Sequence, residues 1–154
     1  MNKKPSIVNE EPKPIDLIRT WEERGYSIGF TNGCFDLIHP GHISLLHCAK
    51  NECDKLVVGL NSDSSVAKLK GKDRPIQKEN ARATVLLALK DVDIVIIFNE
   101  ETPIKLIELI KPDVLIKGGD YKLENIIGRS LVKEVKIIPF VEGYSSTNII
   151  NKCK

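Results

Sequence analysis

Short apolar runs alternate along this chain with longer stretches in which apolar residues recur every three or four positions. Unbroken runs such as L-V-V-G-L are typical of strands that are buried on both faces of a parallel sheet. The runs predict strands at 28–30, 55–61, 93–98, 112–117 and 135–140. The stretches between them have the spacing of amphipathic helices.

Glycines and prolines mark where several of these helices begin or end. Gly25 ends the first, and Pro40 suits the first turn of the second. Thr102 is the expected N-cap of a later helix, with Pro103 in its first turn. Helices are thus predicted from 14 up to Gly25, from about 40, at 79–89 and from 102 to 110, with a weaker helical stretch at 125–133 and a last helix from about 147. The helix at 79–89 is expected to carry on one face Ala81, Val85, Ala88 and Leu89.

Strands that alternate with helices at this spacing predict a parallel sheet with right-handed crossovers, in a three-layer α/β/α sandwich of Rossmann-like type. Four polar segments follow the strands: T-N-G-C-F-D, the predicted loop N-S-D-S-S leading to K-L-K-G-K-D-R-P, K-G-G-D-Y, and E-G-Y-S-S-T. Ligands of such sheets bind at the carboxyl ends of the strands. We therefore expect the four segments to converge on one site.

Composition narrows the class of protein. The 154 residues, 42% apolar and 29% charged, fit a single domain at 14–154, preceded by a flexible lead-in at 1–13 that is rich in proline and charge. A net charge of +2 gives no field for nucleic-acid binding. The sequence shows neither a membrane span nor a signal peptide, which predicts a cytoplasmic protein. The cysteines lack C-x-x-C pairing and are expected to be free thiols.

The segment H-P-G-H is the clearest candidate for a catalytic site. A helix that begins at a strand's carboxyl end presents unpaired N–H groups and the positive end of its dipole, which favour phosphate. His39 and His42 lie three residues apart at this start, with Gly41 leaving room for a ligand against the backbone. Protonated or hydrogen-bonding imidazoles there would stabilise the charge that develops on a transferring phosphoryl group. His47, further along the helix, is expected to be structural or solvent-facing.

The other segments offer groups that suit the same ligand. Lysines and an arginine between 68 and 74, around Gly71, predict a flexible arm that closes over phosphates. In K-G-G-D-Y, two glycines permit close approach, Lys117 can reach a phosphate, and Asp120 can accept bonds from sugar hydroxyls. The hydroxyls of 145–147 at a helix start would hold the β- and γ-phosphates. Magnesium is expected with a triphosphate substrate and not in a protein cage.

Taken together, T-N-G-C-F-D and H-P-G-H resemble the HxGH signature of the nucleotidyltransferase superfamily of cytidylyltransferases and adenylyltransferases, from about Gly25 to Lys152. K-G-G-D-Y is similar to heptose 1-phosphate adenylyltransferases, whereas glycerol-3-phosphate cytidylyltransferases look more like M-G-D-D-W here. The resemblance implies transfer of AMP from ATP to D-glycero-β-D-manno-heptose 1-phosphate, for lipopolysaccharide or related glycoconjugate synthesis. It points to Lys70, in the pattern L-K-G-x-x-R-P, and to Arg82 on the next helix.

The expected site residues fall into three groups. The catalytic residues are His39, His42 and Lys70. The nucleotide-binding residues are Thr31, Asn32, Gly33, Cys34, Phe35, Gly41, Arg82, Lys117, Gly118, Asp120, Ser145, Ser146 and Thr147. The substrate-binding residues are Asp36, Asn61, Asp63 and Arg74, and no protein ligand of a metal is assigned.

Two rival interpretations remain open at this point. The same reaction type with CTP and glycerol 3-phosphate, or another alcohol phosphate, would use the same motifs. A regulatory module that binds a nucleotide without chemistry belongs to a different class, and the presence of both motif histidines argues against it. The sequence also leaves the oligomeric state open, since exposed apolar surface on a helix would allow a homodimer.

Overall fold

The computed structural model describes residues 13–153, so the predicted lead-in lies outside the described residues except for Lys13. Five parallel strands form one sheet, in the order β3-β2-β1-β4-β5. They are β1 (Ile28–Gly33), β2 (Lys55–Asn61), β3 (Ile94–Phe98), β4 (Val114–Gly118) and β5 (Glu134–Ile138). The chain moves outward from β1 to β3 and then returns to the other side of β1, so the strand order reverses between β1 and β4.

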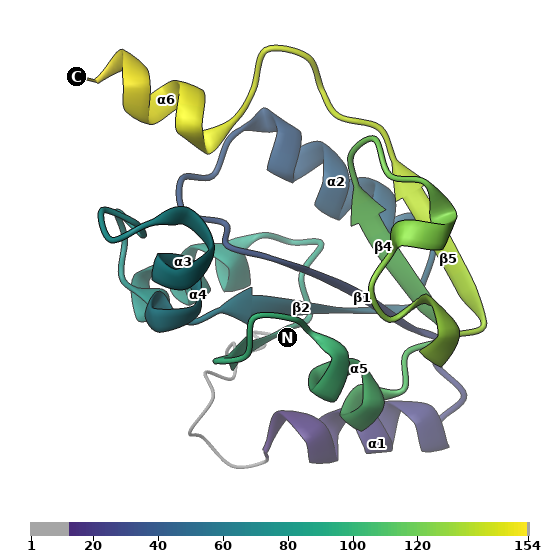
Figure 1. Cartoon of the computed structure of the whole chain (residues 1–154). Coiled ribbons are helices and arrows are strands. Elements are labelled where there is room, and N and C mark those ends of the chain that lie inside the picture. Colours follow the sequence, from purple (N-terminus) through teal and green to yellow (C-terminus); the bar gives the residue numbers. More distant parts are fainter. Residues whose placement is uncertain (1–12, 154) are drawn as a thin grey trace.

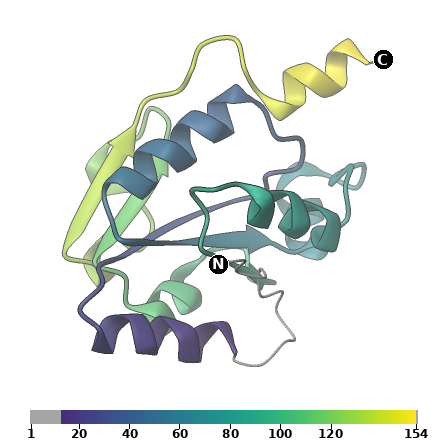
Figure 2. The same ribbon diagram turned by 180° about the vertical axis from the view of Figure 1, so that it is seen from behind.

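Helices cover both faces of this sheet (Figures 1 and 2). They are α1 (Pro14–Glu23), α2 (Pro40–Asn51), α3 (Asp63–Lys70), α4 (Glu79–Ala88), α5 (Ile104–Ile110) and α6 (Ser146–Lys152). Side chains of α2 and α4 pack in one apolar cluster with one face of the sheet, and those of α1 and α5 pack in a second cluster with the other face. The predicted three-layer α/β/α fold is confirmed.

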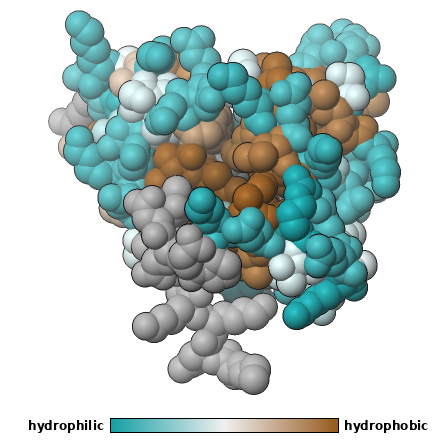
Figure 3. Space-filling view, turned by 90° about the horizontal axis from the view of Figure 1, so that it is seen from below, coloured by the Kyte–Doolittle hydropathy of each residue, from teal (hydrophilic) through white to brown (hydrophobic). Residues whose placement is uncertain are grey.

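The outer surface beside α1 and α5 is also partly apolar. Seen from this side, apolar side chains gather in the middle of the face and hydrophilic residues border them (Figure 3). A wide depression at the amino ends of the strands is lined by Tyr26, Pro112 and Lys133, among others. It lies at the opposite end of β1 and β4 from the four converging segments. Within residues 13–153, no helix has the length and apolar character needed to cross a membrane.

Two predicted segments differ from the structure. The residues N-S-D-S-S do not form a loop, because the Ser62 hydroxyl accepts the N–H of Ser65 at 3.2 Å and thereby caps α3. The stretch 125–133 is not an α-helix either. Gly128, at φ +88°, separates two short 3₁₀ turns, Leu123–Asn125 and Arg129–Leu131. The small polar residues therefore begin a helix, whereas the glycine interrupts one.

The bounds and faces of other elements also shift. β1 continues to Gly33, since Asn32 and Gly33 still pair with β2, and β5 covers 134–138 in place of 135–140. Pro103, not Thr102, is the N-cap of α5. The predicted face of α4 is wrong: its buried residues are Arg82, Ala83, Leu86 and Leu87. The apolar pattern missed this face because one of its members is a buried arginine. All four cysteines are free, as predicted.

Candidate active site

The H-P-G-H segment builds the start of α2 from its own two imidazoles. His39 is the N-cap, and its Nδ1 accepts the N–H of Gly41 at 3.1 Å. In return, Nδ1 of His42 accepts the N–H of His39 at 3.3 Å. This arrangement is a capping box in which histidines replace the usual hydroxyl and carboxylate. Because Nδ1 of each ring is used as an acceptor, Nε2 carries the proton of each neutral ring.

The electrostatics of the site keep these rings neutral. Burial lowers the pKa of His42 to about 4, with contributions from His39 and Lys70, and the carbonyl of Leu37 acts weakly in the opposite direction. Burial also lowers the pKa of His39. At neutral pH both side chains are therefore hydrogen-bond donors through Nε2 and not imidazolium cations.

An aromatic column supports the two histidines. The rings of His39 and His42 stack with centroids 3.8 Å apart, and Phe35 lies 5.1 Å from His42 on the inner side. Phe35 has a φ of +44°, an unusual conformation for a bulky residue, and its ring is buried in the core. At the outer end, the ring of Tyr144 lies 6.3 Å from His39. No sequence pattern predicts this contact, although Tyr144 directly precedes the S-S-T segment.

Lys70 approaches the histidines from another element. It is exposed in the last turn of α3, which ends at Gly71 with φ +102°. Its charge contributes to lowering the pKa of His42. The same charge acts on Cys34, but burial dominates and raises the pKa of this thiol. Lys68 and Lys70 thus belong to a helix, and only residues 71–74 of the segment expected as a flexible arm lie outside it.

A network of paired charges follows the first loop, although Nη2 of Arg74 is buried without a hydrogen-bond partner among residues 13–153. The Asp36 carboxylate, 1% exposed, accepts the N–H groups of Ile76 and Gln77 and the Nε–H of Arg74 at 2.8 to 3.0 Å. Burial alone would raise the pKa of Asp36, but these N–H groups and the Arg74 guanidinium outweigh it and lower the pKa. Asp36 and Arg74, expected to bind substrate, therefore fix the basic segment against the first loop.

Arg82 forms the second half of this network. Its guanidinium is fully buried and makes four hydrogen bonds, to the carbonyls of Gln77, Cys34 and Asn61 and to Oδ1 of Asp63. The Asn61 amide donates to Ser65 at 3.0 Å. Arg82, Asn61 and Asp63, expected to contact ligands, thus make these contacts within the chain. Because Cys34 follows β1 and Asn61 ends β2, Arg82 ties two strand ends together.

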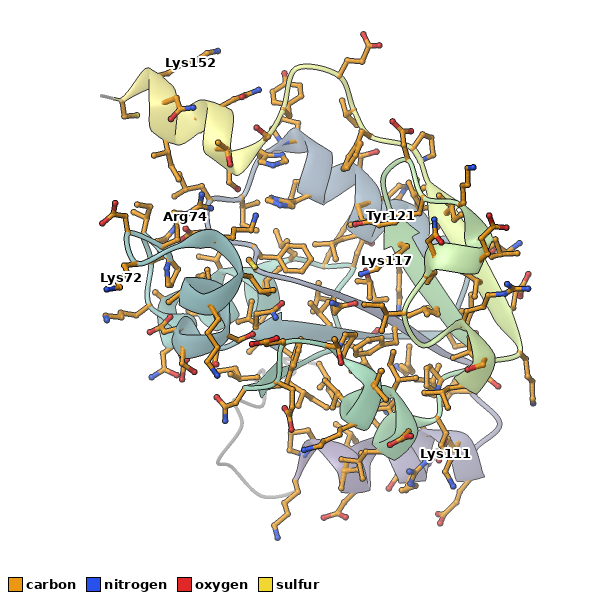
Figure 4. All side chains as sticks on the ribbon, viewed as in Figure 1. Lys72, Arg74, Lys111, Lys117, Tyr121 and Lys152 are labelled. Carbon is orange, nitrogen blue, oxygen red and sulfur yellow. The ribbon has the colours of Figure 1, made fainter. Side chains whose placement is uncertain are left out.

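The carboxyl end of β4 carries a cation of a different kind. In the register of β1 and β4, Phe30 lies beside Leu115, so two residues further on Asn32 and Lys117 share the face of the sheet that α5 covers. The Lys117 ammonium donates to Oδ1 of Asn32 at 3.2 Å and lies 5.9 Å from the centre of the Tyr121 ring. Burial lowers the pKa of Lys117. Figure 4 shows Lys117 and Tyr121 on the β4 side of the molecule, away from Lys72 and Arg74.

The turn after β4 places an aromatic wall next to Lys117. Gly119 has a φ of +124°, and a Cβ at this position would lie 2.6 Å from the Phe140 ring and 3.2 Å from Tyr121. A glycine is therefore required here. Gly118 faces Leu45 of α2 on the opposite side of the sheet, and Asp120 is exposed.

The C-terminal segment crosses over the start of α2 before it forms α6 (Figure 1). Ser145 is the N-cap of α6 and accepts the N–H of Asn148 at 3.0 Å, while Ser146 donates to the carbonyl of Leu37 at 3.0 Å. Thr147 is exposed. Of the three expected phosphate-binding hydroxyls, Ser146 thus holds the segment against the loop before α2, whereas Ser145 caps α6. At the end of β1, the Thr31 hydroxyl is buried without a hydrogen-bond partner among residues 13–153.

The donor atoms around the site bear on the expected magnesium ion. Between residues 13 and 153, the structure holds no cluster of three or more His, Cys, Asp or Glu side chains suited to a metal. The nearby carboxylates of Asp36 and Asp63 already accept hydrogen bonds from arginines. A magnesium ion that arrives on the phosphates of a substrate would need few ligands from these side chains.

Together with the family match and the relatives described next, the parallel sheet, the reversal of strand order and the two imidazole donors mark this protein as a nucleotidyltransferase enzyme. The chain belongs to the cytidylyltransferase-like family, whose sequence profile matches residues 30–152. This match confirms the resemblance inferred from the H-P-G-H segment.

Similar proteins agree with this family. The chain is 55% identical over 139 residues to the bifunctional protein HldE of Nitrobacter hamburgensis, covering 88% of this chain and 28% of that protein. It is 52% identical over 138 residues to HldE of Caulobacter vibrioides, covering 87% and 29%. The chain thus spans less than a third of the length of these relatives.

Solved structures are similar as well. A lipopolysaccharide core biosynthesis protein from Thermoplasma volcanium is 34% identical, with a TM-score of 0.63 over 79% of this chain and 100% of that one. Pantoate-beta-alanine ligase from Francisella tularensis shares the fold, with a TM-score of 0.63 over 88% of this chain and 70% of that one, at 19% identity.

Proposed function

We propose that this enzyme transfers AMP from ATP to D-glycero-β-D-manno-heptose 1-phosphate, giving ADP-heptose and pyrophosphate. The observation that carries the reaction type is the pair of neutral Nε2–H donors fixed at the start of α2, where the charge of Lys70 also acts on His42. Similarity to HldE proteins and the segment K-G-G-D-Y support the choice of ATP and a heptose phosphate. The product would serve the synthesis of lipopolysaccharide or a related glycoconjugate.

The chemistry requires positioning and charge stabilisation, without a covalent enzyme intermediate. A phosphate oxygen of the sugar 1-phosphate attacks the α-phosphorus of ATP, and the bond from that phosphorus to the oxygen bridging to the β-phosphate breaks. Negative charge grows on the α-phosphoryl oxygens and on the departing pyrophosphate. Nε2–H groups of His39 and His42 would donate to these oxygens, and the Lys70 ammonium would neutralise part of the charge.

Other groups would assist in binding. The backbone N–H groups at the start of α2 favour phosphate, and Gly41 allows it to lie against the backbone. Thr147 is exposed in the first turn of α6, and its hydroxyl would donate to the leaving pyrophosphate. Magnesium bound to the triphosphate would reduce the charge of the substrate, with Asp36 and Asp63 left in their own hydrogen bonds.

A grid of substrates tests the proposal. Pyrophosphate release is measured with Mg²⁺ for ATP, CTP and GTP, each against heptose 1-phosphate, glycerol 3-phosphate and other phosphate acceptors. The proposal predicts turnover with ATP and the heptose phosphate. Turnover only with CTP and glycerol 3-phosphate would establish a cytidylyltransferase instead. Nucleotide binding without turnover in any combination would indicate a regulatory module.

The role of His42 has its own test. We predict that His42→Ala lowers kcat by about 10²-fold or more, the effect of removing one preorganised transition-state donor. His47→Ala is the matched control, because His47 is exposed on the same helix and pairs only with Asp91 among the described side chains. A folded His42→Ala enzyme that works at the wild-type rate would exclude the proposed role.

A further inference from the structure

The Lys117 ammonium differs from the other buried cations near the strand ends because its charge is not balanced. Within residues 13–153, its hydrogen-bonding side-chain partner is the neutral amide of Asn32, and no carboxylate lies in ion-pair range. Arg74 and Arg82, by contrast, each contact a carboxylate at 2.9 Å. A partly buried cation without a counter-ion is costly unless an anion joins it. The surroundings of Lys117 therefore favour an anionic ligand.

Three features shape the space around this cation. The Asn32 amide lies opposite Lys117 and offers a second polar group, while the Tyr121 ring, 46% exposed, lies beside the ammonium. Gly119 gives this wall its close packing with Phe140. A cation, an amide and an exposed aromatic face suit a phosphate attached to a sugar ring, since the amide bonds hydroxyls and the aromatic packs against the ring's C–H face.

The position of the group relative to the histidines sets its role. Phosphoryl transfer places the attacking and the leaving oxygens in line, on opposite sides of the phosphorus. His39, His42 and Lys70 would hold the leaving side, at the start of α2. Lys117 and Asn32 lie on the other face of the sheet, at the reversal of strand order between β1 and β4. The attacking phosphate would then arrive from the Lys117 side.

On this basis, and resting on the proposed function, we propose that Lys117, Asn32 and Tyr121 form the subsite for the acceptor sugar phosphate, with Lys117 binding its phosphate and Tyr121 its ring. This assignment replaces the expected contact of Asn32 and Lys117 with the nucleotide. It makes the three residues determinants of acceptor specificity.

Matched substitutions test the subsite. Lys117→Met keeps most of the volume and removes the charge, and Lys111→Met makes the same change at the opposite end of the sheet (Figure 4). Lys117→Met should raise the KM for the sugar 1-phosphate by roughly tenfold to a hundredfold, the loss of one hydrogen bond to a charged group. The KM for ATP should change less than about twofold, and Lys117→Arg should recover part of the loss. A rise in the KM for ATP as large as that for the acceptor would overturn the proposal.

Substitutions of Tyr121 test the contact with the sugar ring separately from the contact with the phosphate. Tyr121→Leu should raise the KM for the sugar 1-phosphate severalfold, and Tyr121→Phe, which keeps the ring, should not. An equal loss in both variants would contradict ring packing.

Calorimetric binding of the sugar 1-phosphate without ATP distinguishes failure of the subsite from failure of the reaction. Binding that Lys117→Met abolishes, in an enzyme without turnover, would keep the subsite and remove the proposed function. If Lys117→Met left both turnover and binding unchanged, the proposed function would stand and the subsite would be excluded. The absence of both binding and turnover would overturn both proposals.

Discussion

Two groups of buried cations lie at the carboxyl ends of the same sheet, and they are arranged in opposite ways. Arg74 and Arg82 are enclosed with Asp36 and Asp63, and almost every donor of Arg82 is used inside the chain. Lys117 has only an amide and an aromatic ring beside it. Paired charges hold backbone segments together, whereas an unbalanced charge is suited to a ligand. The charge of a side chain alone therefore does not identify a binding residue.

Arg82→Leu should have the largest effect on stability. It leaves the Asp63 carboxylate and three carbonyl groups without their donor, and breaking a buried pair in this way costs about 3–5 kcal/mol. For a domain of this size, thermal unfolding should shift down by about 10 °C. Arg129→Leu, at an exposed arginine, is the control. A change of less than about 1 kcal/mol for Arg82→Leu would show that the network is not structural.

Asp36→Asn should cost less, about 1.5–3 kcal/mol, because the side chain keeps an acceptor but loses its charge-assisted bonds with Arg74 and two backbone N–H groups. Urea denaturation measures this difference. The KM for the sugar phosphate should stay near the wild-type value in the folded variant. A large rise in this KM at unchanged stability would return Asp36 to the role of a substrate ligand.

Lys117→Met should change the free energy of unfolding by less than about 1 kcal/mol, since removing an unbalanced cation leaves no buried carboxylate behind. The same denaturation experiment, run beside Arg82→Leu, sharpens the comparison between the two groups. Destabilisation as large as that of Arg82→Leu would mean that Lys117 is part of the scaffold.

The last effect concerns the pH dependence of stability. Because the pKa of His42 is about 4 in the folded protein and near 6.5 when unfolded, the unfolded state binds more protons between these values. This contribution to stability is fully present above pH 6.5 and is lost as the pH falls toward 4. His42→Asn should therefore flatten the stability profile between pH 6.5 and 4. An unchanged slope in the variant would contradict a neutral His42.

Much of the fold could be predicted from local pattern, because apolar strands and amphipathic helices alternate clearly. The H-P-G-H site was also visible, since it is built from neighbours in sequence. The burial of Arg82 was not visible, because its partners Cys34 and Asn61 come from distant strand ends. Similarly, Asn32 and Lys117 meet only through the pairing of β1 with β4, and Tyr144 meets His39 only where the C-terminal segment crosses α2. Contacts that depend on strand order require the three-dimensional structure.

The most direct test of the account follows the phosphorus atom that is transferred. The enzyme is incubated with Mg²⁺, heptose 1-phosphate and ATP labelled at either the α- or the γ-phosphate, and the products are separated. The account predicts that the α-label appears in the nucleotide sugar and that the γ-label appears only in pyrophosphate. Transfer of the γ-label to the sugar phosphate, or failure of the α-label to reach the sugar in an enzyme that binds both substrates, would contradict nucleotidyl transfer at this site.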